Sequence, residues 1–172
     1  MQARAATPAD AAAIARIYNQ GIEDRVATFE TRPRAPRDIA QRAWDDGIHP
    51  LVVAEDAGAV VAFASTSTYR PRDCYSGIAE FSVYVAREAR GRGAGRVALS
   101  ALIQAAEAAG YWKLVSRVFP ENTASLALCR SLGFREVGRY EKHAQLDGVW
   151  RDVIIVERLI PANLAPHGEP AS

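Results

Sequence analysis

The sequence is poor in the residues that cross-link chains or bind metals. It has two cysteines, Cys74 and Cys129, with no CxxC pair and no Cys/His spacing typical of a zinc site. We therefore expect no disulfide framework and no metal. No run of 18 apolar residues is present, which argues against a transmembrane helix. Residues 1–10 lack a basic stretch followed by an apolar one, so we expect no secretory signal and a cytoplasmic protein.

An excess of charge of one sign is also missing. The chain has 21 Lys and Arg against 20 Asp and Glu, which gives a formal net charge of +1. This balance argues against a dedicated nucleic-acid or anionic-membrane protein, although it allows a local basic patch. Apolar residues make up 49% of the 172 residues, so disorder is excluded as the main state. The length fits one domain with a sizeable core.

Helix and strand patterns alternate along the chain, and they predict an α+β domain. A βαβ unit is expected in the middle of its sheet, with Thr7 as the N-cap of the first helix. One domain is expected over 1–161, followed by a flexible tail over 162–172 that carries two prolines. The predicted helices are 8–22, 36–46, 96–109 and 123–132, and the predicted strands are 51–55, 60–69, 79–85, 113–119, 134–137, 140–146 and 149–159.

The most informative segment is the glycine-rich turn Arg90-Gly91-Arg92-Gly93-Ala94-Gly95-Arg96. It follows a predicted strand and opens a predicted helix, where small residues let backbone amides approach an anion at the helix N-terminus. Its arginines add positive charge, so pyrophosphate is a natural ligand. A flexible basic loop is the structural alternative. The glycine spacing does not match GxGxxG, and no GKS or GKT follows, so neither a Rossmann turn nor a Walker A loop is expected.

Three segments in order resemble the GNAT acyltransferase family. Arg90-x-x-Gly93-x-Gly95 is similar to its acetyl-CoA signature, Val83-Tyr84-Val85 to its splayed strand, and Asn122 through Gly133-Phe134 to its Asn…Gly-Phe segment. The resemblance implies a GNAT fold, with a mixed, mostly antiparallel sheet flanked by helices and a splayed strand pair that binds acetyl-CoA as cosubstrate. The cofactor-binding residues implied are Val83, Tyr84, Val85, Arg90, Gly91, Arg92, Gly93, Ala94, Gly95, Arg96, Asn122 and Ser131.

Further segments resemble one branch of this family, the phosphinothricin, methionine sulfoximine and arsinothricin acetyltransferases. This implies an N-acetyltransferase that acetylates the α-amine of a small glutamate-like amino acid, in a homodimer without nucleic acid or membrane. The substrate-binding residues implied are Phe29, Arg72, Asp73 and Tyr75. The segments that carry the resemblance are Tyr18-Asn19-x-x-Ile22-Glu23, Thr28-Phe29-Glu30, Arg72-x-x-Tyr75, Glu80-x-Ser82-Val83-Tyr84-Val85 and Gly148-x-Trp150-x-Asp152-Val153.

The acetyl transfer implied needs a base, because an amine attacks a thioester only in its unprotonated form. Glu80 is the candidate: it interrupts an apolar strand, and it shares a face with Ser82 and Tyr84 by alternation. A strand-edge glutamate in a surface ion pair is the structural alternative, and Glu30 is the second candidate base. Backbone N–H groups near Val83-Tyr84-Val85 are candidates to receive the oxyanion.

The sequence leaves open which group protonates the leaving thiolate. Family members often carry Tyr or His where this chain has Cys129, and a buried structural thiol is the simpler interpretation of that cysteine. Other functions also stay open: acetylation of a protein N-terminus or a polyamine, a non-catalytic CoA-binding sensor, and nucleic-acid binding through the basic turn. The sequence does not distinguish between the possible amino-acid substrates.

Overall fold

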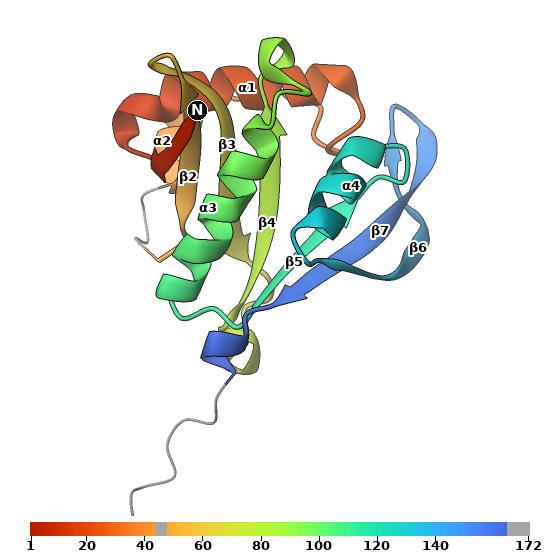
Figure 1. Cartoon of the computed structure of the whole chain (residues 1–172). Helices are drawn as coiled ribbons and strands as arrows, with labels where there is room; N and C mark the ends of the chain where they lie inside the picture. The colour runs from red at the N-terminus through yellow and green to blue at the C-terminus, as the bar shows by residue number, and fades with distance from the viewer. Residues whose placement is uncertain (44–47, 165–172) are drawn as a thin grey trace, which may run out of the picture.

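A seven-stranded mixed sheet forms the centre of the computed structural model, which describes residues 1–43 and 48–164 (Figure 1). The strand order is β1-β2-β3-β4-β5-β7-β6. β4 and β5 run parallel, and every other neighbouring pair is antiparallel. The strands are β1 (Gln2–Ala5), β2 (Leu51–Asp56), β3 (Ala59–Thr68), β4 (Ile78–Val85), β5 (Lys113–Val118), β6 (Arg135–Leu146) and β7 (Val149–Leu159).

Four α-helices cover the two faces of this sheet: α1 (Ala11–Asp24), α2 (Pro36–Ala43), α3 (Ala94–Ala108) and α4 (Thr123–Ser131). α1 packs on the face to which Tyr84 points, since a Cβ added at its Gly21 would lie 2.7 Å from the Tyr84 ring. α3 packs on the opposite face, where Gly95 approaches Val83 and Val85. The four short helices are 3-10 turns: η1 (Pro8–Asp10), η2 (Asp73–Tyr75), η3 (Arg87–Ala89) and η4 (Pro161–Asn163).

The predicted βαβ unit is present as β4–α3–β5 and sets the geometry of the sheet centre. β4 and β5 pair over only three residues, from Ile78↔Lys113 to Glu80↔Val115. Beyond Glu80 the two strands separate, while β5 continues along β7 as far as Val118. The rest of β4 remains paired with β3 up to Val85. The sheet therefore opens between β4 and β5, as the splayed strand pair expected from the sequence requires.

Two features differ from the sequence prediction. β1 was not predicted, because this short edge strand has little apolar alternation, and its pairing with β2 from Gln2↔Glu55 to Ala5↔Val52 defines it. β6 is one strand rather than two, with register irregularities at Glu136/Gly138 and Tyr140/Ala144. Such bulges interrupt the alternation that a sequence pattern detects without ending the strand.

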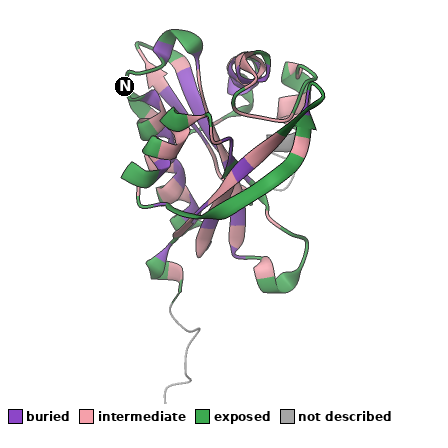
Figure 2. Cartoon of the chain, turned by 90° about the vertical axis from the view of Figure 1, so that its right-hand side faces the viewer, coloured by how far each residue is buried: buried purple, intermediate pink, exposed green. Residues whose placement is uncertain are grey.

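The main core lies between the sheet and its helices, and a smaller apolar cluster lies under the β6–β7 hairpin, around Phe119, Leu146 and Val153. The outer side of this hairpin is largely exposed (Figure 2). η4 overlaps the first residues of the predicted tail. There the side chain of Asn163 donates hydrogen bonds to the carbonyls of Glu107 and Tyr111 at 2.9 and 2.8 Å. The remaining tail residues, 165–172, lie outside the described residues. Within residues 1–43 and 48–164, no helix is both long and apolar enough to cross a membrane.

Candidate active site

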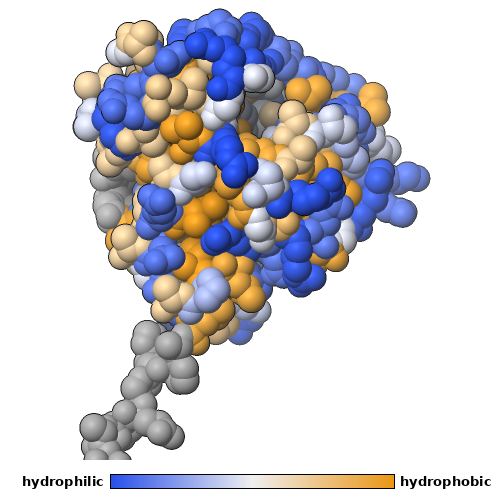
Figure 3. Space-filling view, in the orientation of Figure 1, coloured by the Kyte–Doolittle hydropathy of each residue, from blue (hydrophilic) through white to orange (hydrophobic). Residues whose placement is uncertain are grey.

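The gap between β4 and β5 opens into a groove of about 400 Å³. Its floor is the end of β4, Val83 to Val85, which has no strand partner on the β5 side, and its walls are the N-terminal ends of α3 and α4 and the C-terminal end of α1. Figure 3, drawn in the orientation of Figure 1, shows apolar residues along the middle of the visible surface and hydrophilic ones on either side. The groove contains every predicted cofactor-binding residue except Arg92 and Ser131.

The glycine-rich turn forms the polar end of the groove. Gly91 and Gly93 have φ values of 74° and 88°, a left-handed conformation that suits glycine, and a Cβ at Gly93 would meet no atom within 4 Å. α3 starts at Ala94, so the first amides of the helix have no intrahelical acceptor and carry its partial positive charge. This end of the groove can therefore bind an anionic group closely.

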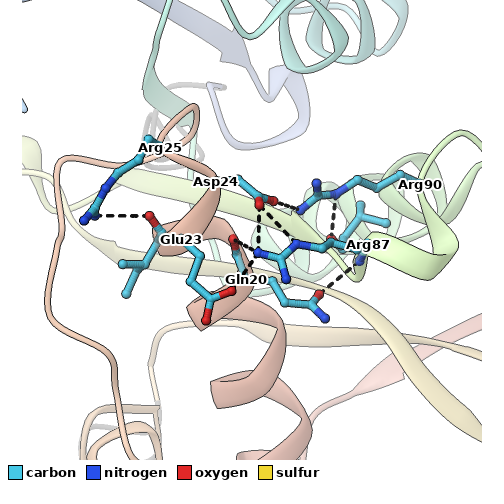
Figure 4. A network of polar contacts seen from close by, with 8 residues as sticks. Gln20, Glu23, Asp24, Arg25, Arg87 and Arg90 are labelled. Carbon is cyan, nitrogen blue, oxygen red and sulfur yellow. Dashed lines mark hydrogen bonds and ion pairs between the residues drawn. The ribbon is translucent and has the colours of Figure 1, made fainter.

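The last residue of α1 holds the turn in place (Figure 4). Asp24 lies 2.7 Å from Arg87 and 2.6 Å from Arg90, and its side chain is 22% exposed. The Arg87 guanidinium, and after it that of Arg90, lowers the pKa of the Asp24 carboxyl. Arg87 also pairs with Glu23 at 2.7 Å, and its backbone amide donates to the side chain of Gln20. This network fixes α1 to the turn on one side of the groove.

The two predicted residues outside the groove have structural contacts instead. Arg92 pairs with Asp56 at 2.6 Å. Ser131 accepts a hydrogen bond from Arg96 at 2.9 Å and donates to the carbonyl of Leu128 at 2.7 Å. Ser131 therefore orients Arg96, which does line the groove.

A small cavity of about 60 Å³ lies deeper between the splayed strands and α4. Asn122 lines both this cavity and the groove, and its side-chain oxygen accepts from the Ser125 amide at 3.2 Å, so it caps α4 and can also contact a ligand. Cys129 is buried at the wall of the small cavity, and this burial raises the pKa of its thiol to about 11. A thiol that holds its proton so tightly is a poor donor to another thiolate.

On the opposite face of the sheet, a second cavity of about 610 Å³ lies beneath α1 and α2. Its floor comes from β3 and β4, including Ser65, Ser67 and Ser82, and Tyr84 lies at its aromatic end beside Phe63. Burial raises the pKa of the Tyr84 phenol. Tyr84 lines the two large cavities and the small one, so the three sites adjoin at this residue.

Glu80 faces the side of the sheet that carries the second cavity. In the antiparallel register Glu80 pairs with Ser67, Ser82 with Ser65, and partners in such a register point to the same face. The predicted sharing of one face by Glu80, Ser82 and Tyr84 is thus consistent with the register. Glu80 is also the last residue of β4 paired with β5, so it stands where the splay begins.

Arg117 of β5 forms an ion pair with Glu80. Its Nη2 and Nε lie 2.6 and 3.1 Å from Glu80 Oε1, and the two side chains are 49% and 25% exposed. Within the described chain, both hydrogen bonds to this carboxylate end on Oε1. Glu80 lines none of the three cavities, and Oε2 accepts neither of the hydrogen bonds from Arg117.

The predicted substrate-binding residues lie away from these cavities. Phe29 packs edge-on against Phe119 at 4.8 Å, in the small apolar cluster. Arg72, Asp73 and Tyr75 lie on η2 and its N-cap, at the end of β4 opposite Val85, where the Arg72 guanidinium is 6.0 Å from the Tyr75 ring. In the chain described here, the fold does not bring these four residues to the lining of either large cavity.

Sequence reasoning missed several side chains at the site. Asp24 and Arg117 belong to no sequence motif, because the residue that each one pairs with lies far away in the chain. Asp24 and Arg87 are 63 residues apart, and Arg117 and Glu80 are 37 apart. Arg34 and Asp38 were missed because no motif marks them, and only the fold places them at the second cavity. In the described ranges, no three His, Cys, Asp or Glu side chains gather as a metal site requires.

Comparisons with known proteins agree with this geometry. Residues 15–134 match the model of the acetyltransferase (GNAT) family. The L-methionine sulfoximine/L-methionine sulfone acetyltransferase of Pseudomonas paraeruginosa is 36% identical over 170 residues, which cover 95% of this chain and 97% of that protein.

Two solved structures are similar over most of their length. A ribosomal-protein-alanine N-acetyltransferase from Brucella melitensis has a TM-score of 0.88 and 35% identity, covering 93% of this chain and 100% of its own. A phosphinothricin acetyltransferase from Sinorhizobium meliloti in complex with AcCoA has a TM-score of 0.88 and 32% identity, covering 96% and 91%. These superpositions confirm the fold expected from the sequence. Because the family model covers most of the chain and these relatives align almost end to end, the chain belongs to the acetyltransferase (GNAT) family.

Proposed function

We propose that the protein transfers the acetyl group of acetyl-CoA to the α-amine of a small glutamate-like amino acid, such as phosphinothricin, methionine sulfoximine or arsinothricin. The observation that carries the proposal is the adjacency of two cavities on opposite faces of the sheet, which share Tyr84 at the splay between β4 and β5. One cavity suits a long anionic cosubstrate and the other a small polar acceptor. The names of the similar proteins support the same substrate class.

The groove fits acetyl-CoA in shape and charge. The amides at the start of α3 and the open space over Gly93 suit the pyrophosphate, with Arg90 and Arg96 beside it. The backbone of β4 from Val83 to Val85 has no strand partner on the β5 side, so it can pair with the pantetheine arm. When bound, acetyl-CoA supplies an acyl group on a good leaving group.

Glu80 is the proposed general base. It accepts the proton of the acceptor's ammonium group, directly or through water, so that the amine has a lone pair for attack. The ion pair with Arg117 orients the carboxylate through Oε1 and leaves Oε2 for the proton. A backbone N–H of the β4 segment that has no partner on the β5 side is the proposed donor to the oxyanion.

Cys129 has no catalytic role in this proposal. Its burial and raised pKa of about 11 make it a structural thiol, and the CoA thiolate leaves unprotonated or takes a proton from water. Phe29, Arg72, Asp73 and Tyr75 stay predictions as substrate residues. The packing of Phe29 on Phe119 also holds the segment between α1 and α2, whose residues Thr28 and Glu30 line the second cavity.

The test is thiol release from acetyl-CoA by the purified protein, over a panel of acceptors. We expect turnover with phosphinothricin, methionine sulfoximine or arsinothricin, and little with spermidine or with a peptide that begins with alanine. The peptide belongs in the panel because a similar structure is named for ribosomal-protein alanine. Turnover with the peptide alone would move the assignment to protein N-termini, and binding of acetyl-CoA without turnover on any acceptor would favour a sensor.

We also propose a homodimer built on the β6–β7 hairpin, whose strands carry the exposed residues Val137, Tyr140, Val149 and Trp150. Trp150 is 55% exposed. Trp112 packs against Gly77 inside the domain and is not part of the proposed interface, and Trp44 lies outside the described residues. Sedimentation at micromolar concentration tests the proposal, and a species of 18.6 kDa alone would contradict it.

A further inference from the structure

The second cavity has charges that the acetyl transfer alone does not explain. It extends from Ser82 and Tyr84 at the splay to Asp38 and Ile39 on α2. Glu30, Arg34 and Asp38 lie on the segment before α2 and on α2 itself, so they line the cavity from the helix side rather than from the sheet. Among the described lining residues, Arg34 is the one arginine, and there is no lysine.

Arg34 is fixed in place from its backbone. The side chain of Asn19, on α1, accepts from the Arg34 amide at 2.8 Å and donates to the Arg34 carbonyl at 2.9 Å. This double hydrogen bond holds the segment before α2 against α1. The starting point of the Arg34 side chain is therefore set by the fold rather than by its salt bridge.

The guanidinium of Arg34 is incompletely neutralised for its degree of burial. Its side chain is 21% exposed, and among the described residues its one ion pair joins Nη2 to Glu30 Oε2 at 3.1 Å, with Glu30 50% exposed. Asp38 gives it no ion pair in this structure, because its carboxylate accepts from the Ala35 amide at 2.9 Å as a helix cap. A planar guanidinium has five N–H donors, so this arginine has the capacity to bind a second anion with two hydrogen bonds.

The reaction fixes the orientation of an amino-acid acceptor in this cavity. Its amine must reach the thioester at the splay, and its α-carboxylate is attached to the same carbon, so both lie near Ser82. From there the side chain of the acceptor can extend along the part of the cavity that Glu30 and Arg34 line. We propose that Arg34 is a specificity-determining residue that binds an anionic side-chain terminus of the acceptor. The inference rests on the proposed function and deepens it.

Two acceptors of nearly equal shape separate this charge effect from packing. Phosphinothricin ends in a methylphosphinate, which is tetrahedral and anionic, and methionine sulfone ends in a methylsulfonyl group, which is tetrahedral and neutral. KM and kcat are measured for both acceptors with wild type, Arg34→Gln and Arg34→Lys. Arg32→Gln is the matched control, because Arg32 lies two residues away, is exposed and does not line the cavity. Calorimetry with acetyl-CoA checks that each variant is folded.

In Arg34→Gln, we expect KM for phosphinothricin to rise on the order of 10- to 100-fold, the usual effect of losing a charged hydrogen-bonded pair, with kcat little changed. KM for methionine sulfone should change by less than about 3-fold, Arg34→Lys should fall between, and Arg32→Gln should resemble wild type. An equal rise for both acceptors, or no rise for either, overturns the role of Arg34.

Failure of the proposed function is visible separately, because wild type then releases no thiol with either acceptor. In that event, calorimetric titration of the two acceptors still decides the inference. Tighter binding of phosphinothricin than of methionine sulfone to wild type, lost in Arg34→Gln, supports an anion site. Equal or undetectable binding in both proteins overturns it.

Discussion

Replacing Glu80 by Gln tests the proposed base most directly. Glutamine is nearly isosteric and neutral, so it keeps the packing of β4 and removes the proton acceptor. The ion pair with Arg117 is lost, but the two side chains are 25% and 49% exposed. Exposed pairs of this kind contribute about 0–1 kcal/mol. For a domain of this size, that corresponds to a fall in Tm of at most about 2–4 °C, so the variant should fold.

The catalytic effect should be far larger than the effect on stability. A positioned general base contributes on the order of 10² to 10⁴ in rate, and we expect kcat of Glu80→Gln to fall by this amount at pH 7. Acetyl-CoA affinity should stay unchanged, because Glu80 does not line the cosubstrate groove. The rate of the variant should recover partly at high pH, where solution supplies more free amine.

Arg117→Gln provides the matched control, since it breaks the same ion pair and keeps the carboxylate. Thiol release by both variants, followed at several pH values, separates base catalysis from charge pairing. The reasoning is refuted if Glu80→Gln turns over like wild type at pH 7, or if Arg117→Gln loses as much activity as Glu80→Gln. Glu30, which lines the second cavity, would then be the base to test.

Three further predictions concern the cosubstrate site and the fold. Gly93→Asp places a carboxylate in the open space at the start of α3, so acetyl-CoA affinity should fall on the order of 10-fold or more by calorimetry; unchanged affinity in a folded variant excludes pyrophosphate there. Hydrogen bonds from Arg4 lower the pKa of Asp10 from 3.8 to about 2. The stability that this pair contributes is therefore complete above pH 4 and lost as the pH falls through about 2, and thermal melts of Asp10→Asn should lack this loss. Gly77→Ala should destabilise the domain by about 1–3 kcal/mol in urea unfolding, because the added Cβ would lie 1.9 Å from the Trp112 ring. The ring has little freedom to move away, since the backbone amide of Trp112 donates to the carbonyl of Gly77. An unchanged free energy of unfolding contradicts this packing.

Local patterns were enough to predict most of the fold. The glycine-rich turn, the long helix after it and the strand before it are contiguous, so their geometry follows from short-range preferences. β1 was missed because four residues at a sheet edge carry little periodicity, and only the partner strand defines them.

The site was predictable to the extent that it is made of backbone. Amides of the turn and of β4 follow from secondary structure, and those residues do line the groove. Side-chain partners such as Asp24 for Arg90, and the wall position of Arg34, depend on how α1 crosses the sheet. The location of Arg72 and Tyr75 at the far end of β4 likewise could not be inferred from the sequence motif alone.

The placement of the two large cavities on opposite faces has a kinetic consequence. Neither reactant needs to leave before the other enters, because each approaches the splay from its own side of the sheet. The nearest thiol, Cys129, is buried and holds its proton up to about pH 11, so it is not suited to carry the acetyl group between two half-reactions. The proposed site therefore predicts direct acyl transfer within a ternary complex, so double-reciprocal plots of initial rate at different acceptor concentrations are expected to intersect instead of running parallel.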